Sequence, residues 1–260
     1  MTGTQTTPPF RLAYVPGVTP AKWTRTWAER LPDVPLDLLV LSAAEAVDAL
    51  HGAAADAALV RLPIDRTGLS AIPLYTETSV VVVPKDHEVS AVDEVSVTDL
   101  ADYVVLHPLD DSLGWENPPG LPAVERPATV ADAIELVAAG VGLLVVPQSL
   151  ARLHHRRDLT YRPLTDADVP QSSVALAWLE AQTTDLVEEF IGIVRGRTVN
   201  SSRGRAATPP PAAAAAAKSP VNAKSKPPQG QGQAKAKAKQ QRNGSGKTQG
   251  AKPGKPRRRP

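Results

Sequence analysis

Arg61 is the first residue whose type and position suggest chemistry. It lies near the end of the apolar run 57–62, which is typical of a buried strand. A guanidinium in such a place can bind a carboxylate through two parallel hydrogen bonds, so Arg61 is a candidate ligand-binding residue. The alternative is a surface ion pair with Asp56 or Asp65, and the sequence leaves both interpretations open.

His107 directly follows another apolar run, 103–106, and can donate or accept a hydrogen bond to a ligand. A solitary histidine can equally be a structural residue whose hydrogen bonds are satisfied within the protein. The adjacent residues His154 and His155 lack the i, i+4 spacing of a helical metal site, so we predict no metal there.

Three predicted helix N-termini supply a second kind of candidate. They follow the pair Val18 and Thr19, then Ser42, and then Thr129. Unpaired backbone N–H groups and the helix dipole favour anions at such ends, so these four residues are candidate ligand contacts. Simple capping of each helix by its hydroxyl side chain is the alternative.

No catalytic pattern accompanies these candidates. The sequence has no cysteine, which excludes disulfides, cysteine nucleophiles and thiolate metal sites in this chain. It also has no nucleophile elbow, phosphate-binding loop or dinucleotide-binding glycine pattern. We therefore predict a binding protein that is not an enzyme and that holds no cofactor.

Strands and helices alternate in the part of the chain that must position these residues. The predicted strands are 10–15, 36–41, 57–62, two runs within 72–84, 103–106, 142–146, 159–164 and 173–179. The predicted helices follow Thr19, Ser42 and Thr129, with short ones at 97–101 and ending at Leu153, and a last one at 185–195. The opening β-α-β-α-β order predicts a parallel sheet with right-handed crossovers. The two strand-like runs within 72–84 have no helix between them, which predicts a crossing from one lobe to another.

Charge divides the sequence into an acidic body and a basic tail. Residues 200–260 contain 15 Lys or Arg and no Asp or Glu, which leaves 14 basic and 27 acidic residues in 1–199. The tail also has almost no large apolar side chains, and so it cannot offset the entropy cost of folding. We predict that 198–260 is disordered and that 1–9 is a disordered N-terminus.

Several passages resemble the effector-binding (substrate-binding) domain of LysR-type transcriptional regulators. The passage 135–147, ELVAAGVGLLVVP, is similar to that family's LVAAGxGxxxLP motif, with Val146 in place of the usual leucine. The PGVTP turn after the first strand and the passage LYTETSVVVVP at 74–84 match in the same order. The resemblance covers about residues 10–197.

The resemblance implies an α/β fold of the two-lobed type 2 periplasmic-binding-protein kind, with a ligand in the cleft between the lobes. It implies that Arg61 and the loops of Thr19, Ser42 and Thr129 face this cleft. The expected domain limits are 10–82 and 170–197 for lobe I and 83–169 for lobe II. Regulators of this family carry a helix-turn-helix before this domain. Here the first strand begins at Phe10, so we expect no such segment and no sequence-specific DNA binding.

We therefore expect a stand-alone domain that binds a small-molecule effector and has a regulatory role. One alternative is a nucleic-acid-associated protein whose body only dimerises and whose tail contacts nucleic acid non-specifically; another is an enzyme on the same fold. A homodimer is compatible with each. The N-terminus has no export signal, and no apolar stretch approaches the ~18 residues of a membrane span. We expect a cytoplasmic protein with no membrane contact.

Overall fold

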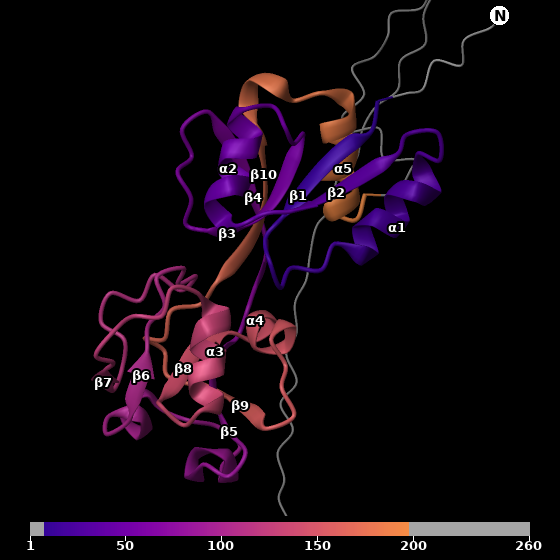
Figure 1. The fold of residues 1–260 in the computed structure, drawn as a ribbon. Helices are drawn as coiled ribbons and strands as arrows, with labels where there is room; N and C mark the ends of the chain where they lie inside the picture. The colour runs from indigo at the N-terminus through magenta and orange to yellow at the C-terminus, as the bar shows by residue number, and fades with distance from the viewer. Residues whose placement is uncertain (1–7, 198–260) are drawn as a thin grey trace, which may run out of the picture. The chain divides into compact units, whose positions relative to one another are not determined.

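The computed structural model of this chain describes residues 8–197, which form two mixed α/β lobes, each built on one five-stranded sheet (Figure 1). The basic tail and most of the segment 1–9, both predicted to be disordered, lie outside the described residues. No helix in the described region is long and apolar enough to cross a bilayer.

The sheet of lobe I has the order β2-β1-β3-β10-β4. Its strands are β1 (Phe10–Tyr14), β2 (Leu36–Val40), β3 (Ala57–Leu62), β4 (Leu69–Thr76) and β10 (Ser173–Leu179). β1 pairs in parallel with β2 and β3, which confirms the predicted parallel arrangement of these three strands. β10, from near the end of the domain, is antiparallel to β3 and β4 and so closes this lobe with a distant segment.

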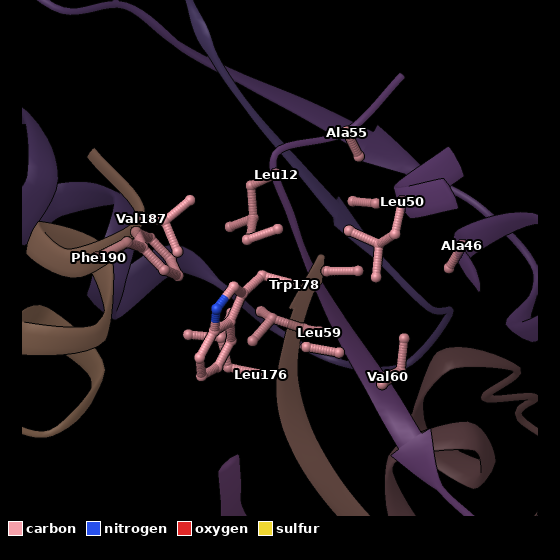
Figure 2. Close-up of a cluster of buried hydrophobic side chains, with 14 of the residues drawn as sticks. Leu12, Ala46, Leu50, Ala55, Leu59, Val60, Leu176, Trp178, Val187 and Phe190 are labelled. Carbon is pink, nitrogen blue, oxygen red and sulfur yellow. The ribbon is translucent and has the colours of Figure 1, made fainter. Parts of the chain in front are cut away.

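Helices cover both faces of this sheet. They are α1 (Ala21–Arg30), α2 (Ala43–His51) and α5 (Asp185–Val194). Figure 2 shows the strand side chains Leu12, Leu59 and Leu176 lying between Phe190 of α5 and Leu50 of α2. All five of these side chains are buried, so burial on both faces stabilises lobe I through the hydrophobic effect.

An aromatic cluster joins α1 and α5 to the first strand. The ring centroid of Trp27 lies 4.6 Å from that of Phe10 and 5.8 Å from that of Phe190. The indole N–H of Trp27 donates a 3.0 Å hydrogen bond to the carbonyl of Val34, so its one polar group is satisfied. The cluster fixes the C-terminal half of α1 against the sheet.

The sheet of lobe II has the order β7-β6-β8-β5-β9. Its strands are β5 (Ser79–Pro84), β6 (Val104–Leu106), β7 (Leu121–Pro122), β8 (Leu143–Pro147) and β9 (Leu159–Pro163). The helices of lobe II are α3 (Val130–Ala138) and α4 (Gln148–Leu153), and short 3-10 turns lie at Glu88–Ala91 and Val97–Leu100. A third 3-10 turn, Glu180–Gln182, follows β10 in lobe I. Two clusters of buried apolar residues form the cores of lobe II.

The structure confirms two of the three predicted helix caps. The hydroxyls of Ser42 and Thr129 each accept a backbone N–H and form capping boxes at α2 and α3. The prediction that Thr19 caps α1 is wrong. Pro20 already has helical φ and ψ angles, and its carbonyl accepts the first helical N–H groups, so α1 begins one residue later. The Thr19 hydroxyl therefore makes no capping bond.

Candidate ligand-binding site

A cavity of about 440 Å³ opens where three chain segments meet. Its lining residues come from 17–23, from 75–78 and from 148–152. The first segment leads from β1 into α1, the second joins β4 to β5, and the third lies in α4. Elements of both lobes therefore line the cavity, and its volume is in the range that small-molecule ligands occupy.

A buried ion pair between Arg61 and Glu77 borders this cavity. Arg61 Nε donates to Glu77 Oε2 at 2.7 Å, and the two side chains are only 7% and 5% exposed. Ser172 Oγ donates to Glu77 Oε2 at 2.9 Å, and Ser149 Oγ donates to Oε1. Arg61 also donates to the Pro16 carbonyl at 2.8 Å and to Ser149 Oγ at 2.9 Å. Both charged groups are thus fully engaged.

This network joins both segments that run between the sheets. The backbone N–H of Glu77, in the outgoing segment, donates to the carbonyl of Ser172, in the returning segment, at 2.8 Å. The N–H of Gln148 at the start of α4 donates to the carbonyl of Thr78 at 2.9 Å. Any rearrangement of one lobe against the other must therefore act on these bonds.

Gly17 allows the loop after β1 to approach this network. Its φ of +84° lies in the left-handed region, which side chains disfavour. A Cβ at this position would lie 2.9 Å from Arg61 Nη2 and 3.0 Å from Ser149 Oγ. Only glycine fits both the backbone conformation and the space.

The protonation states in the cavity follow from its surroundings. Burial alone would raise the pKa of Glu77, but hydrogen bonds from Arg61, Ser149 and Ser172 and the charge of Arg61 outweigh it, and the pKa is lowered. Burial and the charge of Glu77 raise the pKa of Tyr75, with Arg61 acting in the opposite direction. Glu77 is therefore ionised and Tyr75 is a neutral phenol near neutral pH.

The lowered pKa of Glu77 predicts a loss of stability in acid. A carboxyl whose pKa is lower in the folded than in the unfolded state stabilises the fold above its unfolded pKa, about 4.5. That stability disappears as the pH falls from about 4.5 through the folded pKa. We expect urea unfolding to show a smaller acid-induced loss in Glu77→Gln than in the wild type. Equal pH dependence of the two proteins would contradict this.

Among the residues predicted to bind a ligand, Thr19 lines the cavity and Arg61 borders it. Val18 is buried in the core of lobe I at 4% exposure. Ser42 and Thr129 cap their helices and do not line the cavity, and neither does His107. The ligand role of all six residues stays a prediction.

The alternative interpretation of Arg61, a surface ion pair with Asp56 or Asp65, is wrong. Asp56 instead pairs with Arg11 at 2.7 Å, and Asp65 accepts hydrogen bonds from Thr67. His107 Nε2 lies 3.4 Å from Asp111 Oδ2, and its backbone carbonyl accepts a 2.8 Å bond from Arg126 Nε. In this structure His107 therefore has a partner within its own lobe.

Sequence reasoning missed most of the cavity lining. Lys22, Trp23, Gln148 and Arg152 lie on helices α1 and α4, and Glu77 lies in the crossing segment. One signal was available: Glu77 lies two residues before the strongly apolar strand 79–84, and an acidic residue is unusual at a buried position unless it is paired.

Two α/β lobes joined by two crossing segments, with a cavity lined from both, define the class of two-lobed ligand-binding domains. Comparison with known proteins gives the family. Residues 5–198 match the LysR substrate binding domain, and this chain belongs to that family.

The chain is also similar to individual family members. It is 30% identical over 204 residues to a probable hydrogen peroxide-inducible genes activator of Mycobacterium leprae, covering 74% of this chain and 66% of that protein. It is 25% identical over 180 residues to the Hca operon transcriptional activator HcaR of Escherichia coli, covering 65% of this chain and 60% of HcaR. The match thus spans less than two thirds of each of these relatives.

Solved structures share the fold. The BenM effector binding domain with its effector benzoate superposes with a TM-score of 0.60 at 21% identity, over 73% of this chain and 91% of that one. An OxyR mutant of Corynebacterium glutamicum superposes with a TM-score of 0.59 at 23% identity, over 75% and 66% of the two chains. These likenesses confirm the predicted two-lobed fold.

Proposed function

We propose that this domain binds a small polar or anionic metabolite in the cavity between its two lobes and thereby acts as a regulatory effector sensor. The single observation that carries the proposal is a cavity of about 440 Å³ that is lined from both lobes in a member of the LysR family. A ligand touching both lobes has a different affinity for each arrangement of the lobes. Binding therefore shifts the equilibrium between those arrangements.

The relatives' names bear on what this ligand is. Three of them are called probable hydrogen peroxide-inducible genes activators, and one structural neighbour binds benzoate. This chain has no cysteine, and its single methionine is Met1, so a thiol cannot carry a peroxide response here. We therefore favour reversible binding of a metabolite over redox sensing.

Thr19→Ala and Ser42→Ala separate ligand contact from helix capping. Because Thr19 lines the cavity and caps no helix, Thr19→Ala should weaken ligand binding with little effect on stability. Because Ser42 caps α2, Ser42→Ala should cost about 0.5–2 kcal/mol of stability. Any weakening of ligand binding by Ser42→Ala beyond this stability loss would support its proposed contact.

The measurements are urea unfolding and calorimetric titration with a metabolite found in a thermal-shift screen. Unchanged binding in Thr19→Ala would remove Thr19 from the proposed ligand contacts. A stability loss in Thr19→Ala as large as that in Ser42→Ala would mean that it acts as a cap after all.

A second role, non-specific contact with nucleic acid, is favoured by the tail's composition. Its 15 cations in 200–260 are accompanied by no acidic residue. We propose that the tail contacts phosphate groups and reads no sequence, because it has no aromatic side chains to stack on bases. In this alternative the body would mainly dimerise.

Binding of the full chain to duplex DNA should fall steeply with salt. Each phosphate neutralised contributes about −0.9 to the slope of log K against log salt concentration. We expect titrations at two salt concentrations to show this slope for the full chain and none for a chain ending at Arg197. Affinity retained by the shortened chain, or no binding by the full chain at low salt, would contradict the role of the tail.

Two further features of the proposal concern assembly and location. β2 is an edge strand of its sheet, and its residues Leu38 and Val40 are 44% and 59% exposed, which supports a homodimer through this edge.

We place the protein in the cytoplasm because its relatives are named as transcriptional regulators, and DNA is found there.

A further inference from the structure

Two cationic side chains line the cavity from opposite lobes. Lys22 comes from α1 of lobe I and Arg152 from α4 of lobe II, and both residues are exposed. Within residues 8–197 neither forms an ion pair. Arg152 Nε donates a 3.2 Å hydrogen bond to the hydroxyl of Tyr161, which orients the guanidinium and leaves its two NH₂ groups for a ligand.

The acidic residue in the lining does not cancel these charges. The carboxylate of Glu77 is balanced by Arg61 at 2.7 Å, and both of its oxygens already accept hydrogen bonds. The cavity therefore carries a local surplus of two positive charges, although residues 1–199 have 27 acidic and only 14 basic side chains. An anion entering the cavity gains an attraction that the rest of the body opposes.

The remaining lining suits a flat ligand with polar ends. Trp23 is half-buried and Tyr75 is 40% exposed, so each presents aromatic surface to the cavity. The side chains of Thr19, Thr78 and Gln148 have no hydrogen-bond partner among the described residues. They can supply hydrogen bonds to a ligand without breaking existing ones.

We propose that the ligand of this cavity is a small organic dicarboxylate, with one carboxylate on Lys22, the other on Arg152 and its flat body against Trp23 and Tyr75. The two cations come from opposite lobes, and a ligand with two separate anionic groups can pair with both. The two cations repel one another, whereas a dianion that contacts both attracts each of them. The charge of the ligand is thereby coupled to the arrangement of the lobes. This inference rests on the proposed function.

A series of three compounds with one skeleton tests the inference on the full chain: isophthalate, its monoamide and its diamide. They carry two, one and no negative charges and have nearly the same shape. Calorimetric titration should show affinity falling about tenfold or more at each step, because each step removes one charge-assisted hydrogen bond. The affinity of isophthalate should also fall as the salt concentration rises.

The variants Lys22→Gln and Arg152→Gln test whether each of these two cations contacts a carboxylate of the ligand. In each variant isophthalate should bind about tenfold or more weakly, and its advantage over the monoamide should nearly disappear. Arg25→Gln on α1 and Arg157→Gln after α4 are matched controls, because both arginines are exposed and neither lines the cavity. The controls should bind isophthalate as the wild type does.

The inference is overturned if none of the three compounds binds, or if isophthalate binds equally well to the wild type and both glutamine variants. The proposed function is then tested separately with a broad panel of neutral, cationic, monoanionic and phosphorylated metabolites. Stabilisation of the protein by a member of that panel would leave effector binding intact, and stabilisation by none would remove both.

Discussion

Arg61→Ala should lower the free energy of unfolding by about 3–5 kcal/mol, because it leaves the carboxylate of Glu77 buried without its charge partner. Urea unfolding at neutral pH measures this loss. Arg11→Ala is the matched control: its ion pair with Asp56 is 36% and 27% exposed, and such pairs contribute about 1 kcal/mol or less.

A second variant distinguishes the buried charge from general damage to the fold. Replacing Arg61 and Glu77 together by methionine and glutamine should cost less than Arg61→Ala alone, because no unpaired charge remains. A loss below about 1 kcal/mol in Arg61→Ala would contradict the account of this pair. So would a double variant that is less stable than the single one.

Trp27→Ala should lower the free energy of unfolding by about 3–5 kcal/mol. The side chain is 1% exposed and packs against Phe10 and Phe190, so its removal leaves a cavity in lobe I and an unpaired carbonyl at Val34. Thermal and urea unfolding both report this loss.

Trp23→Ala is the contrasting variant on the same helix. Trp23 is half-buried and lines the ligand cavity, so its removal should cost much less stability and should mainly weaken ligand binding. Equal stability losses in the two tryptophan variants would contradict the assignment of Trp27 to the core and of Trp23, one turn earlier on the same face of α1, to the edge of the cavity.

The elements of this fold were largely predictable because their signals are local. Ser42 and Thr129 begin capping boxes that need only residues within one helical turn, and the structure confirms both. The apolar run 57–62 is also a local signal, and it forms the strand β3, which pairs with β1 and β10. The start of α1 was misplaced by one residue because Pro20 can occupy either of two adjacent positions.

The site was less predictable because its contacts are not local. Arg61 pairs with a residue 16 positions away, in a segment that leaves lobe I, and no sequence spacing indicates that partner. Lys22 and Arg152 come together at one cavity although 130 residues separate them in the sequence. Their charges resemble those of any solvated helix until the fold brings both to the same cavity.

The central claim is that a small molecule binds the cavity between the lobes, and a cavity-filling variant tests it most directly. Thr76 is exposed and lines the cavity, so Thr76→Trp should fill it while leaving the core intact. Thr165→Trp, at an exposed site that does not line the cavity, is the control. Titration of the best compound from the thermal-shift screen should show full binding in the wild type and control and none in Thr76→Trp. Undiminished binding in Thr76→Trp would contradict the account.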